Sequence, residues 1–286
     1  MRRALVFGGS GQIGRSLLQR LHEAGWRVDA VSRMPHGDQP GVHWLRGDLE
    51  RVDALPARVD AIFSCGPLDR FARWYAATAV DGPRVVAFGS TSIEAKHASA
   101  DSGERDLARR LRAGEDGVFA AAAARGARAT LLRPTLVYGA GRDATLTRIA
   151  ALARRWHRFP LPRGACGLRQ PVHVEDLAAA AQAACDAPVT HDRAYALPGG
   201  ETLPYREMVA RVLAALEPPP RLLELPPPLF AALLAVARAT GAARGFGAAA
   251  LDRLREDLVF DPVPARSDFG YAPRGFQPTA AMFDAQ

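Results

Sequence analysis

One segment near the amino end, Ala4 to Leu18, constrains the fold more than any other part of the chain. Its first four residues, Ala-Leu-Val-Phe, form an apolar run of strand length, and Gly-Gly-Ser-Gly-Gln-Ile-Gly follows directly. The leucines after the last glycine have helical spacing, so the segment predicts a strand that turns through glycines into a helix. A turn of this kind belongs to a βαβ unit, in which the next strand runs parallel to the first.

A glycine is needed at each of positions 8, 11 and 14 for a different physical reason. Gly8 permits the tight turn, Gly11 lets the backbone approach a pyrophosphate, and Gly14 lets the helix pack close to the strand. The N–H groups at the start of the helix are free to bind an anion. We therefore predict a dinucleotide site formed by Gly8, Gly9, Ser10, Gly11, Gln12, Ile13 and Gly14. The alternative is a glycine-rich turn in some other α/β fold.

The first two thirds of the chain alternate apolar runs of strand length with helix-length periodic stretches. This alternation is typical of an α/β protein with a doubly wound parallel sheet, the Rossmann fold. Strands are predicted at Ala4–Phe7, Arg27–Val31, Val42–Arg46, Ala61–Ser64, Val85–Phe88 and Thr130–Leu132. One short helix, Leu68 to Val80, is predicted between the fourth and fifth strands.

The pattern loosens after Arg133-Pro134. Helices are predicted at about Ala144–Trp156, Pro204–Leu216 and Pro228–Leu258, a strand and helix within Gln170–Ala184, and a Pro/Gly-rich connection over Phe159–Gly167. We interpret residues 1–139 with 170–197 as an NAD(P)-binding domain. Residues 140–169 with 198–286 are interpreted as a small, mostly helical substrate lobe.

Charge and cysteine usage exclude several classes of protein. The net charge is +7, but the arginines are scattered rather than gathered into a stripe with aromatic residues, so nucleic-acid binding is not predicted. Cys65, Cys166 and Cys185 have neither metal-ligand spacing nor a disulfide pattern, which favours a reducing cytoplasm and no metal site. The apolar run Leu225 to Ala237 is too short to span a bilayer, and we interpret it as a packed helix.

The end of the second predicted strand indicates which dinucleotide is bound. About 20 residues beyond the glycines, NAD sites carry an acidic residue for the ribose 2′-OH. Here the strand ends in Ser32-Arg33, and Asp29 lies too early in the strand for that role. A hydroxyl followed by a guanidinium suits a 2′-phosphate, so NADP(H) is favoured over NAD(H). The alternative is that Arg33 is one surface arginine among many.

The third predicted strand is followed by Gly47-Asp48-Leu49. This places the carboxylate of Asp48 where it can accept a hydrogen bond from the adenine amino group. The alternative is that Asp48 caps the next helix.

These motifs resemble the extended short-chain dehydrogenase/reductase superfamily of the NAD-dependent epimerase/dehydratase type. The resemblance covers nearly the whole chain and is carried by Gly8 to Gly14, Gly47-Asp48-Leu49, Leu132-Arg133-Pro134-Thr135-Leu136-Val137-Tyr138-Gly139, Arg169 to Leu177 and Asp257 to Arg274. It implies that Asp48, Leu49 and Arg133 belong to the cofactor site. It also implies a dimer through a helix that is shortened here, between Ser64 and Val85, so the usual dimer is not assumed.

The resemblance implies a catalytic Ser or Thr after the fifth strand, where Phe88-Gly89 leads into Ser90, the first candidate, and Thr91, the second. A hydroxyl there would hydrogen-bond the substrate oxygen during hydride transfer. The alternative is a Ser/Thr-rich turn.

The family's tyrosine and the lysine four residues later are absent. Counted back from Arg133, they would fall at Leu107 and Leu111 or at Ala108 and Arg112. The candidates to replace the tyrosine are Tyr138, Lys96, His97 and His173.

Arg169 matches an arginine that contacts the substrate diphosphate in nucleotide-sugar epimerases, and the alternative is an ion pair with Glu175 or Asp176. Two hypotheses follow. The first is an NADP(H)-binding oxidoreductase or epimerase/dehydratase-like enzyme for a small, nucleotide-sugar-like substrate. The second is a catalytically silent NADP(H)-binding redox sensor or scaffold, for which the apolar helix near Leu229 to Ala237 supplies a partner surface.

Overall fold

The structure is a computed structural model that describes residues 1–37, 39–239 and 253–284, and the chain forms two compact units. Unit 1 comprises Met1–Thr135, Val172–Pro198 and Phe260–Pro273. Unit 2 comprises Leu136–Pro171, Gly199–Val259 and Arg274–Gln286.

Unit 1 is built on a seven-stranded parallel sheet with the order β11-β6-β5-β4-β1-β2-β3. Its strands are β1 Arg3–Phe7, β2 Arg27–Ser32, β3 Val42–Arg46, β4 Ala61–Ser64, β5 Arg84–Phe88, β6 Arg128–Pro134 and β11 Arg193–Leu197. The six strands predicted from the sequence are all present. The seventh, β11, was not predicted, because Arg-Ala-Tyr-Ala-Leu has no β-branched residue and little strand propensity.

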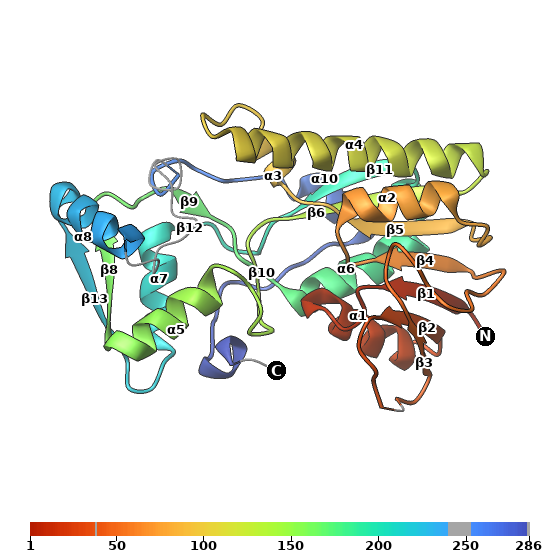
Figure 1. The fold of residues 1–286 in the computed structure, drawn as a ribbon, viewed down its shortest axis with the longest axis horizontal. Helices are drawn as coiled ribbons and strands as arrows, with labels where there is room; N and C mark the ends of the chain where they lie inside the picture. The colour runs from red at the N-terminus through yellow and green to blue at the C-terminus, as the bar shows by residue number, and fades with distance from the viewer. Residues whose placement is uncertain (38, 240–252, 285–286) are drawn as a thin grey trace. The chain divides into compact units, whose positions relative to one another are not determined.

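Helices cover both faces of this sheet (Figure 1). Helices α1 (Gln12–Glu23) and α6 (Val174–Asp186) pack together on one face, and α2 (Leu68–Ala77) and α4 (Ser102–Ala124) pack together on the other. Each helix buries one stripe; in α1 the stripe is Ile13, Leu17, Leu18 and Leu21, whose three- and four-residue spacing is that of a helix face. The fold is therefore the predicted doubly wound α/β type.

The carboxy-terminal stretch 260–273 belongs to unit 1, which corrects the predicted substrate lobe. Helix α10 (Val263–Phe269) lies against β11. The hydroxyl of Tyr195 donates to Asp268 at 2.6 Å, and that of Tyr271 donates to the carbonyl of Pro198 at 2.7 Å. These long-range bonds join the stretch to the sheet, and nothing in its local sequence shows them.

The order of the strands locates the ligand edge of unit 1. Chain order reverses between β1 and β4, and ligands of such sheets bind beyond the carboxyl ends of the strands at this switch point. Because all the strands are parallel, the segments that follow β1, β2, β4 and β5 start from the same edge.

Unit 2 has its own core and two small sheets. It contains α5 (Leu146–Trp156), α7 (Tyr205–Ala214), α8 (Pro227–Ala239) and the 3₁₀ turn η2 (Ala280–Phe283). Strand β8 (Arg158–Pro162) pairs with β13 (Arg221–Leu225) in parallel, and β9 (Leu168–Arg169) pairs with β12 (Leu203–Pro204) in antiparallel. The core includes Tyr138, Leu146, Ile149, Met208, Val212 and Phe276.

Two predictions for unit 2 need correction. The first residues of the predicted Pro/Gly-rich connection Phe159–Gly167 belong to strand β8 instead. Its prolines are tolerated because both strands of a two-stranded sheet are edge strands. The helix predicted over Pro228–Leu258 begins at Pro227 and is described as α8 up to Ala239; residues 240–252 lie outside the described residues, and residues 253–256 form turns. Among the residues described, none of the helices is both long and apolar enough to cross a membrane.

Candidate functional site

The turn between β1 and α1 accepts only glycine at two positions. Gly8 has φ +73°, and a Cβ there would lie 2.9 Å from the carbonyl carbon of Cys65, the residue that follows β4. A Cβ on Gly14 would lie 2.0 Å from the carbonyl oxygen of Gly8. The absence of both side chains brings the first turn of α1 directly against the end of β1.

The same turn has the features of an anion cradle. Gly11 is the N-cap of α1 and offers no side-chain cap, so the first N–H groups of the helix are not satisfied by a capping side chain. Within the described chain, two buried atoms beside the turn, Oε1 of Gln12 and Oγ of Ser64, lack a hydrogen-bond partner. The turn therefore fits the diphosphate of a dinucleotide. Ile13, in the first turn of α1, is buried and anchors this end of the helix.

The end of β2 presents a hydroxyl, an imidazole and a guanidinium. Oγ of Ser32 accepts the N–H of Met34 at 3.2 Å and is hydrogen-bonded to Nε2 of His36 at 2.8 Å. The ring of His36 stacks on Trp44 with 4.0 Å between the ring centroids. Arg33 is exposed in the same loop, and its charge adds to the two backbone hydrogen bonds, from Glu50 and Arg51, that lower the pKa of Asp48.

Asp29 is held within β2, away from the strand end. Its carboxylate accepts from Nε of Arg3 at 2.6 Å and pairs with Nδ1 of His43 at 3.0 Å. Burial alone would raise the pKa of Asp29, but the hydrogen bonds from Arg3 and His43 outweigh burial and lower it. Asp29 is therefore committed to a structural cluster.

Asp48 and Leu49 lie in a turn after β3. The carboxylate of Asp48 accepts the N–H groups of Glu50 at 2.8 Å and Arg51 at 3.2 Å, and these bonds lower its pKa. No helix begins there in the described chain before α2, so the alternative of a helix cap is wrong, although the carboxylate does cap a turn. Leu49 packs against the core of unit 1.

The two hydroxyls after β5 have different surroundings. Thr91 is buried and donates to the carbonyl of Pro134 at 3.1 Å. Ser90 is half-buried, and its Oγ accepts the N–H of Ser92 at 3.1 Å, which leaves the hydroxyl proton free for another acceptor. Ser90 is thus the more accessible of the two candidates.

Arg133, at the end of β6, is bound by two carboxylates. Its Nε donates to Oε1 of Glu115 at 2.8 Å, its Nη2 donates to the other oxygen of Glu115, and its Nη1 donates to Glu94 at 2.8 Å. The hydrogen bonds that Arg133 donates to Glu115, which is 2 % exposed, are the main cause of the raised pKa of Arg133. Sequence reasoning missed Glu115; the signal was a carboxylate on the apolar face of α4, one turn before Val118.

The residues considered as replacements for the tyrosine have partners of their own. Helix α4 contains neither tyrosine nor lysine. Lys96 forms an ion pair with Glu104 at 3.3 Å, and Nδ1 of His97 is hydrogen-bonded to the carbonyl of Glu94. His173 is buried and accepts the N–H of Glu175 as the N-cap of α6.

Tyr138 and Arg169 lie in unit 2. Tyr138 is 1 % exposed and packs edge-on against Phe276. The guanidinium of Arg169 donates to the carbonyls of Leu168, Glu256 and Arg253 and lies over the ring of Tyr205, rather than pairing with Glu175 or Asp176. Burial lowers the pKa of Arg169. Its contact with a substrate stays a prediction.

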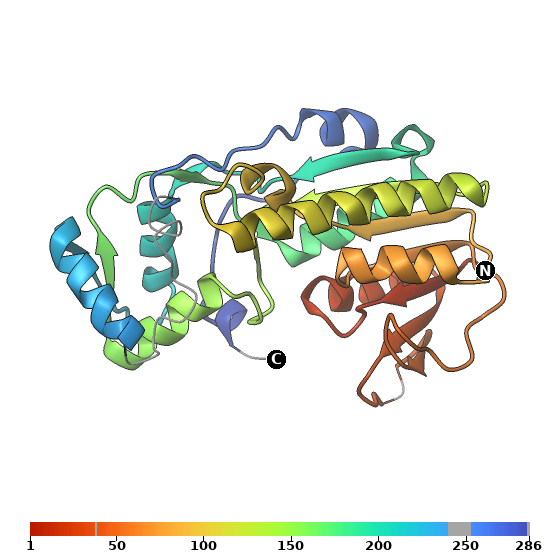
Figure 2. The same ribbon diagram turned by 45° about the horizontal axis from the view of Figure 1, so that its top comes forward.

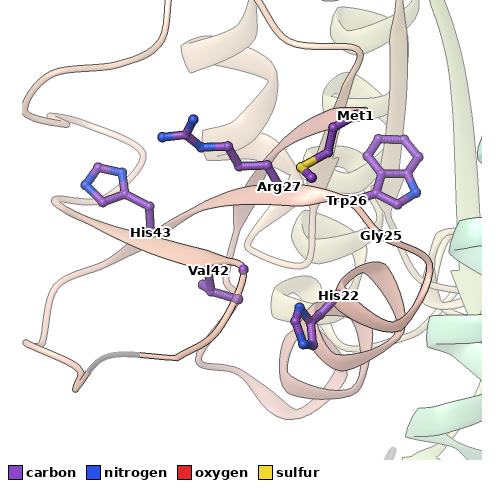
Figure 3. Close-up of a pocket in the computed structure, with 8 residues that line it drawn as sticks. Met1, His22, Gly25, Trp26, Arg27, Val42 and His43 are labelled. Atoms are coloured by element: carbon purple, nitrogen blue, oxygen red, sulfur yellow. The ribbon is translucent and has the colours of Figure 1, made fainter.

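Unit 1 also has a hollow of about 450 Å³ at the amino ends of β1, β2 and β3 (Figure 3). It is lined by Met1, His22, Gly25, Trp26, Arg27, Gly41, Val42 and His43. The amino and carboxyl ends of parallel strands lie at opposite edges of a sheet. This hollow is therefore separate from the glycine turn and contains none of the predicted site residues.

Comparisons with known proteins agree with this architecture. The model of the "NAD dependent epimerase/dehydratase family" matches residues 4–81 and 70–197. A 2-alkyl-3-oxoalkanoate reductase of Stenotrophomonas maltophilia is 28 % identical over 251 residues, which is 75 % of this chain and 76 % of that protein.

Two solved structures share the fold at low sequence identity. An epimerase from Methanothermobacter thermautotrophicus superimposes with a TM-score of 0.70 at 16 % identity, over 98 % of this chain and 89 % of that one. The UDP-glucose 4-epimerase of Thermus thermophilus, solved as a complex with NAD, gives a TM-score of 0.68 at 18 % identity, over 98 % and 97 %. With a family match that runs from residue 4 to residue 197 and a glycine turn built as this fold requires, the chain belongs to the NAD-dependent epimerase/dehydratase family.

Proposed function

We propose that this chain is an NADP(H)-dependent oxidoreductase that acts on a hydroxyl-bearing or carbonyl carbon of a small molecule. The observation that carries the proposal is the set of polar side chains at the end of β2. There the described residues offer Ser32, Arg33 and His36, and the one acid within β2 itself, Asp29, is bound to Arg3 and His43.

The coenzyme preference follows from charge. A 2′-hydroxyl donates a hydrogen bond and needs a carboxylate, whereas a 2′-phosphate carries negative charge and needs donors. Arg33 is exposed and has a planar guanidinium that can bind a phosphate through two hydrogen bonds. A carboxylate at this position would repel the phosphate, so its absence supports NADP(H) as much as the presence of Arg33 does.

The coenzyme, when bound, supplies or accepts a hydride. The residues proposed to hold it are the glycine turn from Gly8 to Gly14 for the diphosphate, Arg33 for the 2′-phosphate, and Asp48 and Leu49 for the adenosine. Ser90 follows β5, the neighbour of the central strand β4, at the ligand edge of the sheet. We assign it the role of donating a hydrogen bond to the substrate oxygen, which stabilises the charge that develops there.

The proton is proposed to move between the substrate oxygen and water through the Ser90 hydroxyl. Helix α4 has leucine or alanine at the positions where the family resemblance implies a tyrosine, and these side chains cannot transfer a proton. Arg133 cannot replace the tyrosine, because its guanidinium donates to Glu115 and Glu94. Turnover is accordingly expected to be slower than general acid catalysis by a tyrosine allows.

Two substrate classes follow from the relatives. The Thermus thermophilus structure is a UDP-glucose 4-epimerase, which favours a nucleotide sugar. The Stenotrophomonas maltophilia protein reduces, by its name, a 2-alkyl-3-oxoalkanoate, which favours a 3-oxo acid. The free thiols of Cys65, Cys166 and Cys185 fit the proposal that the protein works in the reducing cytoplasm.

A thermal-shift assay tests which coenzyme binds, and the change in NADPH absorbance tests whether a substrate is turned over. NADP(H) is expected to raise the melting temperature more than NAD(H), and Arg33→Asp is expected to remove the difference. Turnover of nucleotide sugars and of 3-oxo acids is then measured with wild type and Ser90→Ala. Turnover that is unchanged in Ser90→Ala would remove Ser90 from the reaction.

The second candidate function is a catalytically silent NADP(H)-binding sensor or scaffold. The absence of tyrosine and lysine from α4 is the observation that favours it. Tight NADP(H) binding, without oxidation of NADPH in the presence of any of the nucleotide sugars or 3-oxo acids tested, would support this function over the oxidoreductase.

A further inference from the structure

Five residues at or near the carboxyl ends of β2 and β3 form what we call the β2–β3 corner, namely Ser32, Arg33, His36, Trp44 and Arg46. These strands, drawn in red in Figures 1 and 2, are the last two at one edge of the sheet. Ser32 and Arg46 are register partners, and Trp44 lies two residues before Arg46, so the three side chains share one face. The loop after Ser32 brings His36 onto this face, where its ring stacks on Trp44.

His36 is fixed on one side of its ring and open on the other. Nε2 is hydrogen-bonded at 2.8 Å to Oγ of Ser32, a residue that is 7 % exposed. The imidazole and the indole of Trp44 lie with their centroids 4.0 Å apart at an interplanar angle of 24°. Nδ1 has no hydrogen-bond partner among the residues described, and His36 is exposed. Two contacts therefore orient the ring and leave one nitrogen available to a ligand.

The other polar groups of the β2–β3 corner are donors that lack acceptors. In the described part of the chain, Nε1 of Trp44 is buried without a hydrogen-bond partner. Arg33 and Arg46 are exposed, and neither forms an ion pair with another described residue. The carboxylate of Asp48, in the turn after β3, already accepts two backbone N–H groups of that turn. A ligand that satisfies the corner must therefore be rich in acceptors and negatively charged.

Protonation of His36 changes which hydrogen bonds the Ser32 hydroxyl can make. Oγ of Ser32 accepts the N–H of Met34 at 3.2 Å, which uses one of its two lone pairs. A neutral imidazole has one acceptor nitrogen, which can hold the hydroxyl proton, whereas both nitrogens of the imidazolium are donors. Nε2–H then donates to Oγ and releases the hydroxyl proton to a ligand, and Nδ1–H is a further donor. The imidazolium thus adds one charge and two donors to the corner.

We propose that His36 sets the strength of the coenzyme preference: its imidazolium binds the 2′-phosphate together with Arg33, so the preference for NADP(H) over NAD(H) grows as the pH falls. The inference rests on the proposed function, because it requires a dinucleotide that extends from the glycine turn to the end of β2. A hydrogen bond between an ionised donor and a phosphate is about twice as strong as a neutral one. Histidine ordinarily titrates between about pH 5 and 8, which is the range to be tested.

The other titratable groups at this edge of unit 1 come from the elements that meet there. Arg33 is in the same loop as His36, Arg46 is on β3, and Asp48 is in the turn after β3. The N–H of Gly47 in that turn donates to the carbonyl of Ser32 at 3.0 Å. Helix α1 packs on β2, and the remaining titratable side chains of α1 and β3 are those of Arg15, Arg20, His22, Glu23 and His43, all exposed. None of these groups is bonded to His36, and a variant of His22 controls for a second titrating imidazole.

The test is titration calorimetry of the full chain with NADP⁺ and with NAD⁺ between about pH 5.5 and about pH 8.5. The readout is the affinity ratio, the dissociation constant for NAD⁺ divided by that for NADP⁺. His36→Gln keeps a side-chain N–H for Ser32 but carries no charge. The affinity ratio of wild type is expected to exceed that of His36→Gln about tenfold at the acid end and to approach it at the alkaline end. The phosphate itself titrates at about pH 6, but this affects both proteins alike and cancels in the comparison.

Two further variants sharpen the test. His36→Arg stays positively charged at every pH used, so its affinity ratio is expected to stay high where that of wild type falls. His22→Gln is the matched control, since His22 is also an exposed histidine of unit 1 but lines the hollow at the amino ends of the strands (Figure 3). Its affinity ratio is expected to follow wild type throughout.

Two results would overturn the inference, and they are distinguishable. Affinity ratios of wild type and His36→Gln that stay parallel at every pH, with NADP⁺ still preferred, would remove His36 from the phosphate site and leave the proposed function standing. A wild type that binds NADP⁺ no more tightly than NAD⁺ at any pH would overturn the proposed coenzyme preference as well.

Discussion

The turn after β1 and the segment after β5 start from the same edge of one sheet, yet they differ in what their functions require. The turn depends on backbone geometry: glycines at 8 and 14 allow an approach that no other residue allows, and the first N–H groups of α1, which no side chain caps, are proposed to bind the anion. The segment after β5 is proposed to act through individual side chains: the candidate hydroxyls of Ser90 and Thr91 are present, whereas α4 lacks the tyrosine and lysine that the family resemblance implies. Coenzyme binding and proton transfer are thus separable, because they depend on different kinds of groups.

The largest effect is expected at the turn itself. A Cβ on Gly14 would lie 2.0 Å from the carbonyl oxygen of Gly8, so Gly14→Ala must displace α1 from β1. We expect calorimetry to show no coenzyme binding and the free energy of unfolding to fall by on the order of 4 kcal/mol. Gly117→Ala on α4 is the control, because its Cβ meets only Ala72 at 3.4 Å. Normal coenzyme affinity in Gly14→Ala would contradict the backbone explanation.

The next largest effect is expected from Glu115→Gln. The variant removes the charge that the buried carboxylate places against Arg133, and breaking a buried ion pair costs about 3 kcal/mol. Urea denaturation measures the loss. Glu94→Gln removes the 48 % exposed partner of the same guanidinium and is expected to cost less than about 1 kcal/mol. Equal losses of stability in Glu115→Gln and Glu94→Gln would show that the buried ion pair of Arg133 is no stronger than the exposed one.

A smaller effect is expected from Arg33→Asp, which sharpens the coenzyme assignment. Loss of one charge-assisted phosphate contact is expected to reduce the ratio of NADP(H) to NAD(H) affinity by about 10- to 100-fold. Titration calorimetry with both coenzymes gives the ratio. Arg163→Asp, the same change of charge at an exposed site in unit 2, should leave the ratio at its wild-type value.

The smallest effect on coenzyme choice is expected from Asp29→Asn, because Asp29 is bound to Arg3 and His43. The ratio of NADP(H) to NAD(H) affinity should change by less than about twofold. The variant does change the pH dependence of stability. The pKa of Asp29 is lowered by folding, so its contribution to stability is present above the ordinary carboxyl pKa of 3.8 and is lost as the pH falls through the folded pKa below it.

In Asp29→Asn this acid-dependent loss should disappear from denaturation curves collected below about pH 4. Asp106→Asn, which removes an exposed carboxylate of α4, serves as the control. A change in coenzyme preference in Asp29→Asn would instead place Asp29 in the dinucleotide site.

Much of unit 1 could be predicted because its signals are local. Apolar runs and glycine spacing predict β1, α1 and the strands that follow, since strand and helix periodicities are properties of short segments. The pairing of Arg133 with Glu115 could not be predicted in the same way. Each residue is ordinary in its own segment, and only the packing of α4 against β6 brings them together.

The sequence by itself determined the kind of fold, the place of the glycine turn and the absence of tyrosine and lysine from α4, because these depend on residue type and spacing alone. Tertiary structure decided which polar side chains are already engaged and which apolar ones are exposed. It placed Asp29 in an ion cluster, joined residues 260–273 to the sheet and left Leu229, Leu233 and Val236 of α8 exposed. The physical reason is that engagement and burial depend on neighbours distant in the chain, which no local pattern specifies.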